Sequence, residues 1–308
     1  MTRVLVVSQH ADAYRQCLET KPLVGATVAF AKNTADAVPE APDAEVLFGA
    51  PDLLAPLLAK CTGLRWLQSS WAGVTPLIRA DKRDYVLTGV KGIFGQAMGE
   101  YVLGWLLALE RNIPQHYQAR DWLPITGESL AGKRLGILGT GSIGKAVAAY
   151  ANAFGITVSG LNSDGRAVEG FATCVASGDK YRFANGLDYL LSLLPDTAAT
   201  DGFVDEAMLA ALSAGAIFIN AGRGNVVSVE ALTRGLGTGQ LRHAVLDVFA
   251  EEPLPQGNAL WTTPGISITS HTAAPTPVRA IVDVFRSNYE RYRSGEALDY
   301  RIDFEKGY

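Results

Sequence analysis

The sequence predicts an α/β protein with two Rossmann-like or flavodoxin-like domains, each built on a parallel sheet. Three observations lead to this fold class. Short apolar runs alternate with helical patterns along most of the chain, which is typical of β-α-β units. One such unit carries the glycine-rich hexapeptide GTGSIG. At 308 residues the chain also exceeds the size at which single cores stop growing, so two domains are expected.

Composition is that of an ordinary globular enzyme. The hydrophobic content is 48%, the charged content is 19% and the net charge is −4, which argues against a broad surface for nucleic acid or anionic membranes. The start, MTRVLVVSQH, becomes polar too soon for a signal peptide, and no apolar run reaches the roughly 18 residues of a membrane span. Cys17, Cys61 and Cys174 lie far apart without metal-ligand spacing. We therefore expect a cytoplasmic protein without metal, nucleic-acid or membrane partners.

Strand and helix patterns alternate through the first 93 residues. Helices are predicted near 11–20 and 52–60, and strands are predicted at RVLVVS, ATVAFA, EVLFGA, LRWLQS and YVLTGV. The turns WAGV at 71–74 and VKGIFG at 90–95 follow strand patterns. Ligands of open α/β sheets gather at the carboxyl ends of strands, so both turns belong near a site.

The segment 95–116 predicts a long helix that is apolar nearly all round. Tyr101, Trp105 and Leu109 are among its bulky residues. Such a helix must be covered on more than one side, either by a domain seam or by a partner subunit. A fully buried core helix in a monomer is the alternative.

The hexapeptide GTGSIG lies between a predicted strand at 134–138 and a helix that opens near Ser142. Gly139 permits a tight turn, Gly141 lets backbone N–H groups approach a pyrophosphate, and Gly144 lets the helix pack close to the strand. The helix opening offers unpaired N–H groups to the phosphates. A glycine-rich turn in some other α/β protein is the alternative, but the order of strand, glycines, helix and second strand predicts a dinucleotide site.

The end of the second strand indicates which dinucleotide binds. An NAD-preferring unit carries an acidic residue about 20 positions after the glycines, where it binds the ribose 2′-OH. Here Leu161 is followed by Asn162 and Ser163, and Asp164 and Arg166 come next. Because Ser163 and Arg166 remain to serve a 2′-phosphate, NADP(H) is the predicted cofactor, with NAD(H) use left open.

Later strands end at three polar residues, Arg223, Glu252 and His271. After Leu161 comes a polar, weakly patterned segment. Strands are then predicted in LDYLLSLLPDT, AIFINAGRG, HAVLDVF and ISITSH. Helices are predicted near 205–212 and 228–236, and a closing helix is predicted over 277–294. Taken singly, the three could be a surface arginine, a turn carboxylate and a partly buried histidine. Their shared position at strand ends predicts that they meet where the nicotinamide should lie.

These blocks resemble the D-isomer-specific 2-hydroxyacid dehydrogenase family, most closely its glyoxylate/hydroxypyruvate reductase-like members. The resemblance covers nearly the whole chain and rests on SSWAGVT, GIFGQAMGEYVLG, LGILGTGSIG, SLLPDTAAT, INAGRGNVV, AVLDVFAEEPLP and ITSH. It implies a substrate domain of residues 1–97 and 277–308, with a dinucleotide-binding domain of residues 98–276 inserted between them. It also implies a homodimer through the helix near 99–115.

The family resemblance implies NAD(P)H-dependent reduction of a small 2-oxo acid, such as glyoxylate or hydroxypyruvate, to the D-2-hydroxy acid. Arg223 would hold the carboxylate and carbonyl, His271 would protonate the carbonyl oxygen, and Glu252 would orient His271 and favour its protonated form. A dinucleotide-sensing, corepressor-like protein with little turnover is the competing interpretation, since such relatives keep much of the same site. Ser270 departs from the family, which commonly has proline before the histidine.

The resemblance assigns two further groups of residues. Backbone N–H groups would grip the substrate carboxylate at Ala72, Gly73 and Val74. Asp247 would bind the nicotinamide carboxamide, and the 194–200 turn would line the adenine and ribose side. The full cofactor set is Gly139, Thr140, Gly141, Ser142, Ile143, Gly144, Asn162, Ser163, Arg166, Leu194, Pro195, Thr200, Asn220, Ala221, Gly222 and Asp247.

Overall fold

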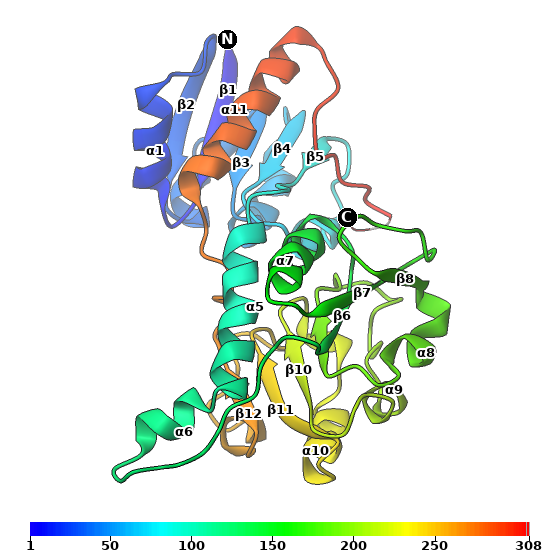
Figure 1. Ribbon diagram of the computed structural model, residues 1–308. Helices are drawn as coiled ribbons and strands as arrows, with labels where there is room; N and C mark the ends of the chain where they lie inside the picture. Colours follow the sequence, from blue (N-terminus) through cyan, green and yellow to red (C-terminus); the bar gives the residue numbers. More distant parts are fainter. Residues whose placement is uncertain (306, 308) are drawn as a thin grey trace. The chain divides into compact units, whose positions relative to one another are not determined.

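The computed structural model describes residues 1–305 and 307 (Figure 1). The described chain divides into two compact units: unit 1 comprises Met1–Ile93 and Thr276–Tyr308, and unit 2 comprises Phe94–Pro275. These boundaries fall at 93/94 and 275/276, whereas the sequence placed them at 97/98 and 276/277. Of the predicted segment 277–308, Lys306 and Tyr308 lie outside the described residues.

Unit 1 holds a parallel sheet in the order β2-β1-β3-β4-β5, the order of flavodoxin-like sheets. Its strands are β1 (Thr2–Val7), β2 (Ala26–Ala31), β3 (Val46–Gly49), β4 (Trp66–Ser69) and β5 (Val86–Thr88). Its helices are α1 (Ala11–Thr20), α2 (Thr34–Ala37), α3 (Pro51–Leu54), α4 (Thr75–Ile78) and α11 (Val278–Ser294), with short 3-10 helices η1 (Ala41–Asp43) and η2 (Ala55–Lys60). The helix predicted near 52–60 is thus split, because Pro56 cannot donate a hydrogen bond to continue α3.

Helix α11 returns from unit 2 to cover the sheet of unit 1. The ring of Phe285 stacks on Phe48 with centroids 4.1 Å apart and on Trp66 with centroids 5.2 Å apart. Tyr14 of α1 meets Phe48 edge-on at 5.2 Å. This aromatic layer buries the apolar face of α11, which explains why a C-terminal helix belongs to the N-terminal unit.

A buried amide on α11 also fastens the end of the chain to the sheet. Asn288 is 1% exposed. Its Nδ2 donates to Gln68 Oε1 at 3.0 Å and to the carbonyl oxygen of Asp299 at 3.1 Å, while its Oδ1 accepts from the Asp299 N–H at 2.8 Å. Gln68 Oε1 also accepts from Thr88 Oγ1 at 2.9 Å. One side chain therefore ties helix, sheet and C-terminal segment together.

Replacing Asn288 with alanine is expected to lower the free energy of unfolding by about 1–3 kcal/mol, because buried partners lose their hydrogen bonds where water does not reach them. The midpoint of urea unfolding measures this loss. Ser287→Ala, at an exposed position of the same helix, is the matched control and should change stability by less than about 0.5 kcal/mol. Equal midpoints for the two variants would contradict the prediction.

Unit 2 holds a parallel sheet in the order β12-β11-β10-β9-β6-β7-β8. Its strands are β6 (Arg134–Leu138), β7 (Thr157–Asn162), β8 (Thr173–Ala176), β9 (Tyr189–Ser192), β10 (Ala216–Asn220), β11 (Leu241–Leu246) and β12 (Ile266–Ile268). Its helices are α5 (Gly95–Glu110), α6 (Ile113–Gln118), α7 (Ser142–Ala153), α8 (Lys180–Ala184), α9 (Glu206–Ala210) and α10 (Val229–Gly237), with short η3 (Ser177–Asp179), η4 (Gly224–Val226) and η5 (Ala259–Thr262).

From β8 to β11 this is the Rossmann order 3-2-1-4-5-6, with β12 added at one edge. The order reverses between β6 and β9, which is the switch point where dinucleotides bind in such sheets. The predicted fold class is confirmed.

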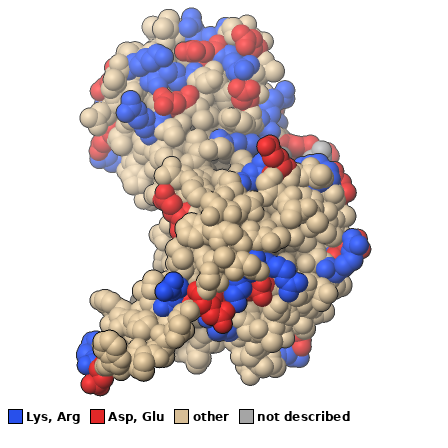
Figure 2. Space-filling model, viewed as in Figure 1, with Lys and Arg blue, Asp and Glu red and all other residues tan. Residues whose placement is uncertain are grey.

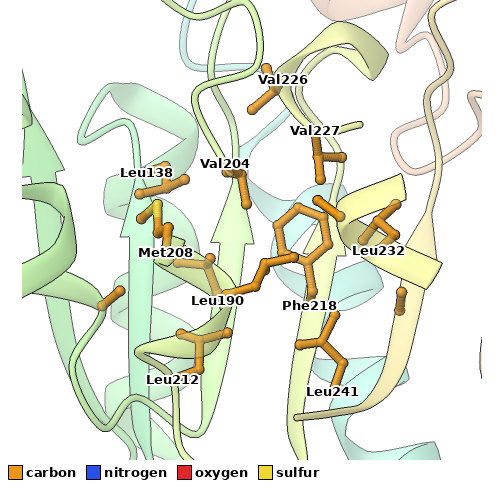
Figure 3. Close-up of a cluster of buried hydrophobic side chains, with 14 of the residues drawn as sticks. Leu138, Leu190, Val204, Met208, Leu212, Phe218, Val226, Val227, Leu232 and Leu241 are labelled. Carbon is orange, nitrogen blue, oxygen red and sulfur yellow. The ribbon is translucent and has the colours of Figure 1, made fainter. Parts of the chain in front are cut away.

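The sheet of unit 2 is buried on both faces. Successive residues of β10 point to opposite apolar clusters, Ile217 to the one under α5 and α7 and Phe218 to the other. Figure 3 shows the second cluster, where Phe218 lies between Leu190 and Leu232. Burial on both faces is why these strands appear in the sequence as continuous apolar runs rather than as alternating patterns.

Two elements of unit 2 differ from the sequence prediction. The helix predicted over 95–116 is broken into α5 and α6 at Asn112, which has φ 51°. Pro114 explains the break, because it has no N–H to donate to Glu110 and its ring opposes a continuous helix. Strand β8 was not predicted, since it lies in the polar segment after Leu161 and pairs only along β7, at the edge of the sheet.

Among the described residues, no helix combines the length and apolar character needed to cross a membrane.

Candidate active site

The glycine loop between β6 and α7 lies at the switch point of the unit 2 sheet. Gly139 has φ +104°, a conformation that favours glycine. A Cβ on Gly144 would lie 2.2 Å from the carbonyl oxygen of Gly139, so only glycine lets α7 approach the loop this closely. A Cβ on Gly141 would meet nothing within 4 Å. The loop therefore packs tightly on one side and leaves open space on the other.

This open space fits a dinucleotide pyrophosphate. Gly141 is the residue that precedes α7, and no side chain caps the helix there. The first N–H groups of the helix, beginning at Ser142, are thus available to an anion at the positive end of the helix dipole. Within the loop, Thr140 is buried, and Ile143 in the first turn of α7 is half-buried against the core.

Backbone segments from neighbouring strands close around the glycine loop. A Cβ on Gly139 would lie 3.3 Å from the carbonyl oxygen of Leu193, and one on Gly222 would lie 2.7 Å from the backbone of Leu194. Thr200 Oγ1 donates to the Pro195 carbonyl oxygen at 2.6 Å, so its hydroxyl shapes the turn that contains Leu194 and Pro195. The ends of β6, β9 and β10 meet here.

After β7, Asn162 occupies the place where a ribose-binding carboxylate is usual. Its Oδ1 accepts from the Gly165 N–H at 2.7 Å, and its Nδ2 donates to the Arg166 carbonyl oxygen at 2.9 Å and to Thr140 Oγ1 at 3.2 Å. The amide therefore shapes the 163–166 loop.

Within that loop, Ser163 and Arg166 are exposed. Arg166 Nη1 lies 3.3 Å from both carboxylate oxygens of Asp164. The backbone N–H and the guanidinium of Arg166 hold the pKa of Asp164 below its usual value. The loop thus presents a cation and an anion side by side to solvent.

The turn after β10 brings Arg223 to the carboxyl edge of the sheet. Asn220 is fully buried; its Nδ2 donates to the Arg223 carbonyl oxygen at 2.9 Å and its Oδ1 accepts from the Gly222 N–H at 3.2 Å. The N–H of Ala221 donates to the Ser192 carbonyl oxygen at 3.1 Å. Burial lowers the pKa of Arg223, an effect that the nearby carboxylate of Glu252 opposes.

His271 and Glu252 form a hydrogen-bonded pair, with 2.8 Å between Nδ1 and Oε2. The other carboxylate oxygen, Oε1, accepts from the Phe249 N–H at 2.8 Å. Because Nδ1 is engaged, Nε2 is the nitrogen left to face a reacting group. The imidazole side chain is 54% exposed and the carboxylate side chain 35% exposed, so the pair is reachable from solvent.

The pair shifts the pKa of both partners. The hydrogen bond and charge of Glu252 raise the pKa of His271 against the opposing effects of partial burial and of Arg223. Burial opposes ionisation of Glu252, but hydrogen bonds from His271 and the Phe249 N–H outweigh it and lower the pKa of this carboxyl. The structure therefore brings Arg223, Glu252 and His271 within electrostatic reach of one another.

Asp247 holds the backbone around His271, and this role of Asp247 was not predicted from the sequence. His271 has φ +55°, an uncommon conformation for a non-glycine residue, and its N–H donates to the Asp247 carbonyl oxygen at 2.8 Å. The Asp247 side chain, 2% exposed, accepts from the N–H groups of Thr272 at 2.8 Å and Ala273 at 3.1 Å and from Thr269 Oγ1 at 2.5 Å. A contact between Asp247 and a carboxamide stays a prediction.

The predicted carboxylate-binding residues Ala72, Gly73 and Val74 lie in unit 1, in the turn between β4 and α4. Ser69 shapes this turn, because its Oγ accepts from the Trp71 N–H at 3.0 Å and donates to the Trp71 carbonyl oxygen at 2.8 Å. Ala72 and Gly73 are not buried.

Residues 103–273 match the family model "D-isomer specific 2-hydroxyacid dehydrogenase, NAD binding domain". The chain belongs to this family. A glyoxylate/hydroxypyruvate reductase A from Serratia proteamaculans is 33% identical over 240 residues, which are 77% of this chain and 74% of that protein. The predicted family, its reductase-like branch and the class of NAD(P)-dependent dehydrogenase are confirmed.

Solved structures agree with this assignment. A D-isomer specific 2-hydroxyacid dehydrogenase family protein from Aeromonas salmonicida has a TM-score of 0.94 and 37% identity, covering 98% of this chain and 99% of that one. An NADPH-dependent glyoxylate/hydroxypyruvate reductase from Sinorhizobium meliloti, in complex with NADP and sulfate, has a TM-score of 0.87 and 26% identity over the full length of both chains.

Proposed function

We propose that the protein reduces a small 2-oxo acid of the glyoxylate or hydroxypyruvate class to the D-2-hydroxy acid, with NADPH as the preferred cofactor. The observation that carries this proposal is the His271–Glu252 pair beside Arg223 at the edge of a dinucleotide-binding sheet. In this proposal unit 2 binds the dinucleotide.

Each of the three side chains has a distinct role in the proposed reaction. The Arg223 guanidinium offers a fork of donors to the carboxylate and carbonyl oxygens of the acid, and it steadies negative charge that develops on the carbonyl oxygen. His271 Nε2 gives its proton to that oxygen. Glu252 keeps the His271 imidazole oriented and protonated until this proton transfer. When bound, the nicotinamide supplies the hydride.

Three features support the preference for NADPH. Asn162 stands where a carboxylate would repel a 2′-phosphate, and the exposed Arg166 and Ser163 follow within four residues. Arg166 offers the guanidinium donors that suit phosphate. The Sinorhizobium meliloti relative, which is described as NADPH-dependent, holds NADP.

The test is a steady-state assay of the purified protein with NADPH and NADH against a panel of small 2-oxo acids, followed by the loss of reduced-cofactor absorbance. We expect the highest kcat/KM with NADPH and a glyoxylate-like acid. An equal or higher value with NADH would overturn the cofactor proposal. Cofactor binding without turnover on any 2-oxo acid would instead favour a dinucleotide sensor.

We also propose a homodimer through α5 and the projection that follows it. Tyr101, Trp105 and Leu107 of α5 are only partly buried. In the projection, Tyr117 is 86% exposed and Trp122 is 93% exposed. Figure 2 shows a nearly uncharged surface on the projection formed by α6 and the following loop, apart from its tip. Large exposed apolar side chains of this kind favour a protein partner.

Sedimentation equilibrium tests the oligomeric state, and a monomer at micromolar concentration would contradict the proposal.

Replacing Glu252 with glutamine is expected to move the pH dependence of reduction. His271 must be protonated to donate, and the Glu252 carboxylate raises its pKa, so reduction in the wild-type protein should persist above the ordinary titration range of histidine and decline at higher pH. Without the carboxylate charge the pKa of His271 falls, and the decline should begin at lower pH. Profiles of kcat/KM against pH measure the shift, and identical alkaline limbs would contradict it.

A further inference from the structure

A hydroxyl from helix α5 reaches the loop that carries His271. Tyr101 Oη lies 2.8 Å from Thr269 Oγ1, and Thr269 Oγ1 lies 2.5 Å from Asp247 Oδ1. Tyr101 and Thr269 are 168 positions apart in the chain. This line of hydrogen bonds connects a helix outside the catalytic strands to the carboxylate beneath the proposed proton donor.

The direction of each bond follows from which group can donate. The Asp247 carboxylate accepts from two backbone N–H groups, so the Thr269 hydroxyl gives it its single proton. The Thr269 oxygen is then free only to accept, and Tyr101 must be the donor. Burial raises the pKa of Tyr101 to about 12, so the phenol keeps this proton throughout the working range.

Asp247, the last acceptor in this line of hydrogen bonds, sets the geometry of His271. Asp247 holds the N–H of His271 through its carbonyl oxygen and the next two N–H groups through its carboxylate. These contacts keep His271 at its left-handed φ, from which its ring meets Glu252 at 2.8 Å. The charged groups around the imidazole are Glu252, Arg223 and Asp247.

We propose that Tyr101 is a positioning residue for His271, acting through Thr269 and Asp247. The hydroxyl of Tyr101 fixes the rotamer of Thr269, which in turn fixes the Asp247 carboxylate and the backbone that it holds. Hydrogen bonds in such a line strengthen one another, so removing the Tyr101 hydroxyl also weakens the contacts made by the Asp247 carboxylate. This inference rests on the proposed role of His271 as proton donor.

Tyr101→Phe is the primary test, because it removes only the hydroxyl and keeps the ring that packs edge-on against Trp105. We expect a loss of about two- to tenfold in kcat, little change in the KM for NADPH, and an alkaline limb that moves to lower pH. Tyr150→Phe, which removes the hydroxyl of an exposed tyrosine on α7, is the matched control and should leave all three unchanged.

A second measurement does not depend on turnover. The protein has four histidines, so the titration of His271 can be followed by NMR and assigned by its disappearance in His271→Asn. We expect a lower pKa for His271 in Tyr101→Phe than in the wild-type protein. This readout would stand even if the protein failed to reduce any 2-oxo acid, so failure of this inference and failure of the proposed function can be told apart.

The route through Thr269 is tested by combining variants. Thr269→Val removes the intermediate hydroxyl at nearly constant shape, and Tyr101→Phe should then cost nothing further, because the line is already broken. Thr269→Ser keeps the hydroxyl and should keep most of the coupling. The proposal is overturned if Tyr101→Phe leaves kcat and the His271 titration at wild-type values, or if it costs the same factor in the Thr269→Val background.

Discussion

Replacing His271 with alanine is expected to lower kcat for 2-oxo acid reduction by about 10²–10⁴-fold, the range lost when a general acid is removed. The expectation follows from the pairing of Nδ1 with Glu252, which leaves Nε2 as the nitrogen that can deliver a proton. The affinity for NADPH should stay near the wild-type value, because the glycine loop lies on separate strands of the sheet. Steady-state kinetics and a fluorescence titration of NADPH measure the two effects.

His10→Ala is the matched control for the histidine variant. It removes an exposed imidazole that lies just before α1 in unit 1, and it should keep wild-type turnover. Turnover by His271→Ala within a few-fold of this control would rule out His271 as the proton donor. Loss of NADPH binding together with turnover would point instead to a disturbed dinucleotide site.

Replacing Arg166 with alanine is expected to lower kcat/KM for NADPH by about 10- to 100-fold, the worth of a charged hydrogen-bonding partner for phosphate. Efficiency with NADH should change little, because NADH has no 2′-phosphate for the guanidinium to meet. The ratio of the two efficiencies, measured with the same 2-oxo acid, isolates this contribution from any general effect on folding.

Asp164→Asn provides a control of opposite sign in the same loop. Asp164 is paired with Arg166 and would also face an incoming 2′-phosphate, so neutralising it should keep or raise efficiency with NADPH. A fall with NADPH in both variants would show that the loop contributes shape rather than charge. Equal losses for NADPH and NADH in Arg166→Ala would contradict the assignment of Arg166 to the phosphate.

Elements with strong local patterns were predictable. The apolar runs that became β1, β6 and β10 are buried on both faces, and such burial leaves a continuous hydrophobic signal in the sequence. The glycine loop was predictable because φ at Gly139 and the close approach at Gly144 each demand glycine. The three polar residues at strand ends were predictable because parallel strands deliver their carboxyl ends to one edge.

Elements that depend on partners far along the chain were not predictable. Strand β8 carries a weak apolar pattern, and its pairing with β7 defines it. The break between α5 and α6 had a local cause in Pro114, which the apolar pattern across 95–116 hid. The fastening of α11 by Asn288 depends on Gln68, which lies 220 positions away.

The amino-acid sequence alone determined the family, the fold class and the residue types at the candidate site, because glycine conformation, strand burial and donor chemistry are local properties. Only the tertiary structure decided how these residues are held. Asp247 holds the backbone of His271, Asn162 shapes the loop that carries Arg166, and Tyr101 of α5 reaches the loop that carries His271. Asp247 and Tyr101 contact segments that lie far from them in the chain, and no pattern within one segment shows which distant side chain will pack beside it. Asn162 acts within its own loop, whose backbone conformation the residue pattern does not reveal.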